Sequence, residues 1–222
     1  MTQPNFFGET PKLYSVTPVW QNVETIFDCL TALDNFVDEL IICEGKWIGY
    51  EGELRSIDGT LDEIVRFIKT AKHHVTFMML PQPMNQVDIR NLMIDHIPSQ
   101  SLFIVIDSDE IVREYPAPDK LKELLKSDVK GYCIRSYDIL EKNNIDGHLM
   151  DLPKIWRKVD GLHYSRNHRY LDIYDTPVIY NTKDFPACKD FSFIHMSQKK
   201  TRQQSEAYKK FLLDWEYSDK FK

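Results

Sequence analysis

The sequence has few of the features that mark disulfide-bonded or membrane-spanning proteins. Its four cysteines lie far apart and include no Cys-x-x-Cys pair, so we expect neither a disulfide framework nor a cysteine zinc site. No stretch approaches the roughly 18 consecutive apolar residues of a membrane helix, and no basic-then-apolar signal segment opens the chain. We therefore expect a cytoplasmic protein without a membrane span.

Positive charge is also scarce relative to negative charge. The chain has 28 lysine and arginine residues against 34 acidic ones, which gives a net charge of −6. A protein that follows nucleic-acid phosphates by bulk charge needs the opposite balance, so we expect no nucleic-acid partner. The sequence contains no repeat, low-complexity tract or linker, and its length suits one sizeable core. We therefore expect a single domain over residues 1–222.

Short apolar runs alternate with amphipathic segments through the first half. The predicted strands are residues 12–17, 37–43, 75–80 and 102–106, and the predicted helices are residues 24–33, 60–68 and 85–97. Pro18 is expected to end the first strand, and Thr60 with Glu63 forms a capping-box pattern at the start of the second helix. Fully apolar strands that alternate with helices are typical of α/β proteins with a mostly parallel sheet flanked by helices.

The second half of the chain is less regular. It suggests a helix over residues 119–127, a strand over 131–140, a mixed segment over 143–180 and a closing helix over 201–215. Another apolar strand ends at His195. We expect this half to fold onto the sheet formed by the first.

The strand predicted over residues 102–106 leads directly into four polar residues, Asp107-Ser108-Asp109-Glu110. Ligands of parallel sheets bind at the carboxyl ends of the strands, which is where these residues fall. Carboxylates held close together repel one another, and a hard divalent cation such as Mn²⁺ or Mg²⁺ relieves that repulsion. The segment therefore predicts a cation site, with a surface turn that caps the next helix as the alternative.

Five segments resemble, in the same order, those of the family 2 glycosyltransferases and their relatives, which have the GT-A fold. They are residues 14–18 with 22–24, residues 37–45, the Ser-x-Asp-Gly-Thr turn at 56–60, the helix that carries Gln86 and Arg90, and residues 107–110. The resemblance implies a GT-A, Rossmann-like α/β fold. It also implies that residues 1–115 bind a nucleotide-sugar and that residues 116–222 bind the acceptor.

The resemblance assigns roles to particular residues. Those expected to contact the nucleotide-sugar are Thr17, Glu24, Glu44, Asp58, Arg90, Asp107 and Ser108, and those expected to bind the cation are Asp107, Asp109 and His195. Four of them have a structural alternative: Glu44 suits an exposed strand-end acid, Asp58 a turn or cap, Arg90 an ion pair, and His195 a packed or surface ring. This chain also departs from the family pattern, because residues 45–55 separate Glu44 from the Ser-x-Asp-Gly-Thr turn.

The catalytic base has no clear sequence signal. A transfer with inversion needs a carboxylate that takes the proton of the acceptor hydroxyl. The candidates are Asp138, Asp146, Asp151, Asp160 and Asp172. Relatives often carry a His-Glu pair in this half, where this chain has His168-Arg169.

Taken together, the sequence predicts a metal-dependent glycosyltransferase that moves a sugar from a nucleotide-sugar, most simply a UDP-sugar, to a sugar-bearing or other hydroxyl acceptor. One alternative is a nucleotide-sugar-binding module without catalysis. The other is a phosphohydrolase of the haloacid dehalogenase type, whose nucleophilic aspartate normally follows the first strand of its domain. Here the acidic segment follows the fourth predicted strand, which disfavours that alternative.

Overall fold

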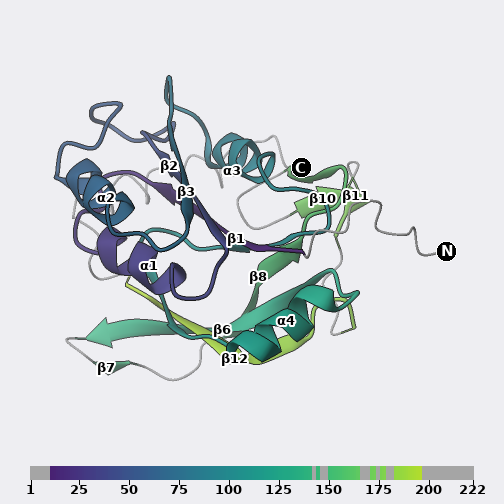
Figure 1. The fold of residues 1–222 in the computed structure, drawn as a ribbon. Helices are drawn as coiled ribbons and strands as arrows, with labels where there is room; N and C mark the ends of the chain where they lie inside the picture. Colours follow the sequence, from purple (N-terminus) through teal and green to yellow (C-terminus); the bar gives the residue numbers. More distant parts are fainter. Residues whose placement is uncertain are drawn as a thin grey trace.

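A long, curled sheet organises the chain and confirms the predicted α/β fold (Figure 1). The computed structural model describes residues 11–141, 144–145, 150–165, 171–173, 176–178 and 183–196. Its strands run in the order β3-β2-β1-β4-β8-β6-β12-β5, with β7 paired to β6, and β9, β10 and β11 form a separate small sheet. The predicted helix over residues 201–215 and the His168-Arg169 pair lie outside the described residues.

The elements of the first half are β1 (Leu13–Val19), α1 (Ile26–Leu33), β2 (Glu39–Glu44), α2 (Thr60–Ile68), β3 (His74–Met79), α3 (Gln86–Ile94), β4 (Leu102–Val105) and β5 (Glu110–Glu114). Those of the second half are α4 (Pro118–Lys126), β6 (Gly131–Glu141), β7 (Asn144–Ile145), β8 (Met150–Arg157), β9 (Leu162–Tyr164), β10 (Leu171–Ile173), β11 (Thr176–Pro177) and β12 (Ala187–His195). In the part of the chain that the structure describes, no helix has the length and apolar character needed to cross a membrane.

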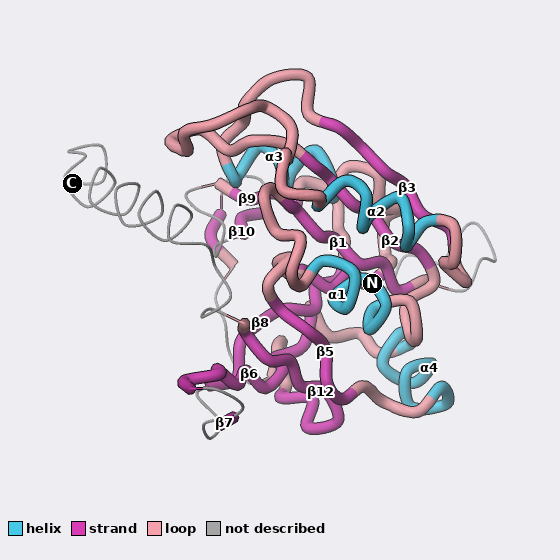
Figure 2. The backbone as a smooth tube through the Cα atoms, turned by 90° about the vertical axis from the view of Figure 1, so that its left-hand side faces the viewer, coloured by secondary structure: helices cyan, strands magenta, loops and turns pink. Residues whose placement is uncertain are grey.

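Strands β1 to β4 are parallel. Strands β1, β2 and β4 are buried on both faces, whereas the edge strand β3 is only partly buried. Alternate residues of each strand enter two different cores, because successive side chains of a strand point to opposite faces. In β2, Leu40 and Ile42 join the core covered by α1 and α2, whereas Ile41 and Cys43 join the core covered by α3. Helices α1 and α2 therefore cover one face of these strands and α3 covers the other. Figure 2 shows the same helices and strands turned by 90°.

The second half extends the sheet through antiparallel and parallel pairs. Strand β8 lies antiparallel to β4, β6 antiparallel to β8, and β12 parallel to β6, with α4 packed beneath β6 and β12 (Figure 1). The short β5, which the sequence did not predict, pairs antiparallel with β12, and this pairing places His195 opposite Glu110. The end of β12 therefore returns to the acidic segment after β4.

Two local predictions were wrong. Strand β1 continues through Pro18 to Val19. The missing N–H of Pro18 breaks no pairing with β4, because β4 pairs with β1 only as far as Val16. Helix α2 has no capping box, since its N-cap is Gly59, whose φ of 98° is left-handed, and no side chain caps it there.

Candidate active site

The acidic segment forms a tight turn at the carboxyl end of β4. The N–H of Glu110 donates to the carbonyl of Asp107 at 2.8 Å, and the N–H of Ile106 continues the pairing with β1 through the carbonyl of Val16. Ser108, Asp109 and Glu110 are buried, whereas the Asp107 side chain is 28% exposed. We call residues 107–110 the acidic turn.

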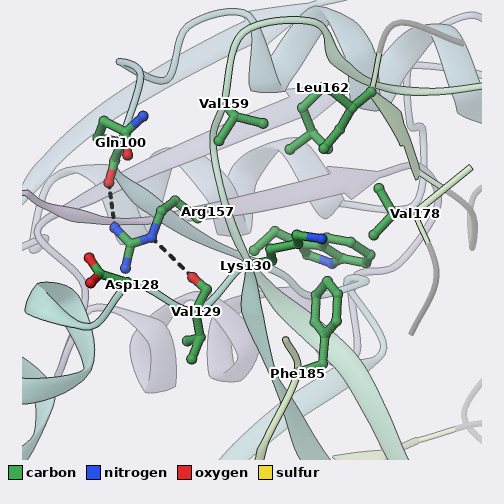
Figure 3. A pocket seen from close by; sticks show the side chains of 11 residues that line it. Gln100, Asp128, Val129, Lys130, Arg157, Val159, Leu162, Val178 and Phe185 are labelled. Carbon is green, nitrogen blue, oxygen red and sulfur yellow. Dashed lines mark hydrogen bonds between the residues drawn. The ribbon is translucent and has the colours of Figure 1, made fainter. Parts of the chain in front are cut away.

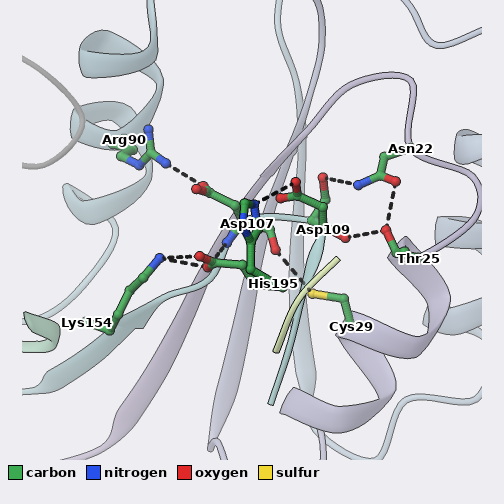
Figure 4. Close-up of polar contacts among 10 residues, drawn as sticks. Asn22, Thr25, Cys29, Arg90, Asp107, Asp109, Lys154 and His195 are labelled. Carbon is green, nitrogen blue, oxygen red and sulfur yellow. Dashed lines mark hydrogen bonds and ion pairs between the residues drawn. The ribbon is translucent and has the colours of Figure 1, made fainter. Parts of the chain in front are cut away.

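Each acid of this turn meets a different basic residue (Figure 4). Asp107 is ion-paired with the Arg90 guanidinium from α3. An Asp109 oxygen lies 3.2 Å from His195 Nε2, and Lys154 Nζ on β8 lies 2.8 and 2.7 Å from the two Glu110 oxygens. In Figure 4, Arg90 and Lys154 reach the turn from the same side, opposite Asn22 and Thr25.

Burial acts on two titratable groups at this turn. It raises the pKa of the Glu110 carboxyl above its ordinary value, the charge of Lys154 opposes that rise, and the charge of Asp107 adds to it. Burial also raises the pKa of the Cys29 thiol well above its ordinary value, and the acids of the turn act in the same direction. The Cys29 thiol lies 3.8 Å from the Asp107 carbonyl, so it packs against the turn as a neutral group.

The predicted cation ligands are only partly assembled. Asp109 and His195 come together. The carboxylate suits Mn²⁺ or Mg²⁺, whereas an imidazole nitrogen is typical of transition metals, so the pair fits Mn²⁺ better than Mg²⁺. Asp107 instead contacts Arg90. Within the described ranges, no group of three or more His, Cys, Asp or Glu side chains is arranged to hold a metal ion. Two protein ligands still fit a cation that completes its shell with ligand phosphates and water.

The Ser-x-Asp-Gly-Thr turn acts on the backbone between β1 and α1. Ser56 Oγ accepts from the N–H of residue 21 at 2.8 Å, Thr60 Oγ1 from that of residue 22 at 2.7 Å, and an Asp58 oxygen from that of residue 23 at 3.2 Å. The other Asp58 oxygen accepts from the Thr60 N–H and hydroxyl. Both Asp58 oxygens thus already have protein partners, as the turn-or-cap alternative expects.

Asn22 is a site residue to which the sequence gave no role. Its amide nitrogen donates to Ser108 Oγ at 2.8 Å, and its amide oxygen lies 2.7 Å from the Thr25 hydroxyl. The Thr25 hydroxyl also lies 2.8 Å from the Ser108 carbonyl. The segment fixed by the Ser-x-Asp-Gly-Thr turn therefore holds the acidic turn in place. Asn22 stands two residues before Glu24 in the segment that resembles the family pattern, and this position was the available sequence signal for it.

Glu44 faces inward. Its carboxylate is fully buried, accepts from the Ser56 N–H at 2.8 Å and lies 3.5 Å from the Arg55 guanidinium. These contacts attach the additional residues 45–55 to the end of β2. The same segment packs on Trp20, whose ring N–H donates to the Glu53 carbonyl at 3.2 Å.

Two other residues that were predicted to bind the donor, Thr17 and Glu24, make no described contact with the acidic turn. Thr17 is fully buried inside β1, and its hydroxyl has no hydrogen-bond partner among the described residues. Glu24 is exposed just before α1. The described contacts do not bring either residue to the acidic turn.

The candidate bases differ in their placement. Asp138 stands opposite His195 in the pairing of β6 with β12, so its backbone neighbours the residue that contacts Asp109. Asp151 and Asp160 are exposed, Asp172 is buried in β10, and Asp146 lies outside the described residues. Of the candidates in described strands, Asp138 is the one that pairs in register with His195.

A cavity of about 220 Å³ lies at the other end of β4 from the acidic turn (Figure 3). Its wall includes Trp156 and Phe185, whose rings meet edge to face at 5.0 Å. Arg157 donates to the carbonyls of Gln100 and Val129, and burial lowers its pKa. Because Gln100 precedes β4 and the acidic turn follows it, this cavity is separate from the site.

No family model and no curated protein sequence matches this chain. A structure of S. aureus TarS 1-349 with UDP-GlcNAc matches with a TM-score of 0.52 and 13% identity, over 94% of this chain and 67% of that one. TarS 1-349 with UDP gives a TM-score of 0.46 at 15% identity, over 60% and 38% of the two chains. Glucosyl-3-phosphoglycerate synthase from Mycobacterium tuberculosis gives 0.38 at 16%, over 59% and 45%.

The similarity to the TarS structure with UDP-GlcNAc establishes the fold and nothing finer. Of the three, only the TarS structure with UDP-GlcNAc reaches a TM-score above 0.5, and it covers almost the whole chain. The chain spans 38 to 67% of the length of the TarS structures compared here. The fold is therefore GT-A-like, as the sequence resemblance implied.

Proposed function

We propose that this chain is a glycosyltransferase that moves a sugar from a UDP-sugar to a hydroxyl acceptor with the help of Mn²⁺ or Mg²⁺. The contact between Asp109 and His195 is the observation that carries the proposal. It joins two metal-ligating groups at the carboxyl edge of a parallel sheet, where ligands of such sheets bind. The similar fold of TarS, whose structure holds UDP-GlcNAc, supports a nucleotide-sugar as the donor.

Asp109 and His195 would hold the cation, which would stabilise the negative charge of the departing diphosphate. The chain's own residues keep the turn in position for this task. Arg90 fixes one carboxylate oxygen of Asp107, and the partial exposure of that side chain leaves it accessible to hydroxyl groups of the donor. Asn22 fixes Ser108 from the other side.

The transfer itself is a direct displacement with inversion. The acceptor oxygen bonds to the anomeric carbon, the bond from that carbon to the diphosphate oxygen breaks, and the acceptor proton passes to a carboxylate. We assign this base to Asp138, because its backbone stands beside His195. Asp138→Asn should then keep donor binding and lose transfer, whereas Asp160→Asn, an exposed control, should keep both.

Calorimetry of UDP and a panel of UDP-sugars, in Mn²⁺ and in chelator, tests the proposal. UDP should bind at least about tenfold more tightly with Mn²⁺, because the cation joins the diphosphate to the protein. One preferred UDP-sugar should release UDP slowly even without an acceptor, and Asp109→Ala should stop that release. Binding without turnover of any donor or acceptor would indicate a binding module instead. A phosphorylated Asp107 would indicate a phosphohydrolase.

A further inference from the structure

Glu110 connects the acidic turn to a strand of the second half. Its buried carboxylate receives the Lys154 ammonium on both oxygens, at 2.8 and 2.7 Å. One of these oxygens also accepts from the backbone N–H of Asp107 at 2.9 Å. A single carboxylate therefore links β8 to the first residue of the turn, and Glu110 is not free to serve as a cation ligand.

Lys154 is unusually enclosed for a lysine. Its side chain is only 15% exposed, and its ammonium lies 5.1 Å from the centre of the Phe193 ring on β12. Phe193 is two residues before His195 on the same strand. Lys154 thus stands between the acidic turn and the strand that supplies its histidine.

A buried carboxylate is costly unless it is paired. Without Lys154, the Glu110 carboxylate would lose its counter-charge and turn toward water. The Asp107 N–H would then lose its fixed, charged acceptor. The effect should concentrate at residues 107–109, because the hydrogen bond from the Asp107 N–H is the one that passes from Glu110 into the turn.

We propose that Lys154 is a positioning residue, which holds Glu110 and through it fixes the turn in which Asp109 meets His195. The expected effect of Lys154 on donor binding rests on the proposed function, whereas its expected effect on the conformation of the acidic turn does not. The residue acts through Glu110 and needs no contact with the ligand.

Backbone hydrogen exchange of the nucleotide-free protein tests the proposal directly. In Lys154→Met, the amides of residues 107–109 should exchange at least about tenfold faster than in the parent protein, since the hydrogen bond from the Asp107 N–H that holds this segment opens more often. Lys154→Arg should restore slow exchange, because a guanidinium can pair with the same carboxylate. Lys158→Met is the matched control. The Lys158 side chain is 13% exposed, and the residue directly follows the C-terminal end of β8.

Affinity for UDP with Mn²⁺ provides the functional measurement. It should fall by roughly 10- to 100-fold in Lys154→Met, the usual effect of removing a partner that orients a ligating group. Lys158→Met should leave it unchanged. If the parent protein and both variants bound no nucleotide, the proposed function would fail. The exchange experiment would still decide the role of Lys154.

Equal exchange at residues 107–109 in the two methionine variants would overturn the proposal. So would a general rise in exchange across the sheet, which would indicate loss of stability alone. If circular dichroism showed Lys154→Met to be unfolded, Glu110→Gln would replace it, since the amide keeps the shape of the side chain and removes its charge. That variant should again speed exchange at the turn, and unchanged exchange would refute the positioning role.

Discussion

Removing Arg90 and removing Asp107, the two members of one ion pair, should lower the free energy of unfolding by unequal amounts. The Arg90 side chain is 3% exposed and the Asp107 side chain 28% exposed. Removing the carboxylate in Asp107→Ala leaves a guanidinium buried without its counter-charge. Removing the guanidinium in Arg90→Met leaves a carboxylate that water can reach, and the methionine keeps the packing of the aliphatic stem.

The structure sets the size of each effect. Stranding one member of a buried pair costs about 3–5 kcal/mol. In the part of the chain that the structure describes, the buried Nε–H of Arg90 already has no partner. We expect Asp107→Ala to lower the free energy of unfolding by about 3 kcal/mol, near the lower limit because Gln86 Oε1 remains 3.5 Å from the guanidinium. Arg90→Met should cost only about 1–2 kcal/mol, because its partner is partly hydrated.

Urea unfolding of the two single variants and the double variant measures these values. The double variant should be less destabilised than the sum of the two, because the second change removes the group that the first left unpaired. Lys120→Met, in an exposed pair with Glu123, is the control and should show no measurable change. The reasoning would be refuted if Arg90→Met cost as much as Asp107→Ala, or if both stayed within about 0.5 kcal/mol, the usual range of surface substitutions.

Three other results are expected. Asp109→Asn should keep the circular dichroism of the fold but bind UDP equally with Mn²⁺ and with chelator in calorimetry; retained metal dependence would contradict its role as a ligand. Asn91→Ala should lose about 1–3 kcal/mol in urea unfolding, because its amide group bonds both the N–H and the carbonyl of Tyr164 at 2.7 and 2.9 Å, whereas the exposed Asn35→Ala should change little. Burial raises the pKa of Cys43 to about 12, so at about pH 8 it should stay a thiol and react with a disulfide reagent only after unfolding; prompt reaction in the folded protein would contradict this.

Local sequence patterns predicted where the candidate site lies, but they did not predict which of its carboxylates are available to a ligand. An apolar run followed by acids identified the end of β4 as a place for a ligand, and the resemblance selected Asp109 and His195, which the structure places 3.2 Å apart. Asp58 and Glu44 fit the same resemblance, yet the protein itself occupies their carboxylates. A motif reports which residue types are present, whereas hydrogen bonds made across the fold decide which of their atoms remain available.

The sequence alone determined the elements whose causes are local. Strand β2 is built from branched and apolar residues, and its alternate side chains enter two cores, so its composition required a strand covered on both faces. The spacing of Ile64 and Ile68 likewise required a helix with one buried side over residues 60–68. Strand β5 has no such pattern, and it forms because β12 returns beside it.

Only the tertiary structure decided how the acidic turn is neutralised. Its partners are 17, 44 and 86 residues away along the chain, namely Arg90, Lys154 and His195. Sequence spacing carries no signal for such pairs, because Coulomb attraction depends on distance in space and on burial, and folding sets both. The chain sequence therefore specified where acids gather at the end of a strand. The packing of α3, β8 and β12 around that end specified which charge each acid meets.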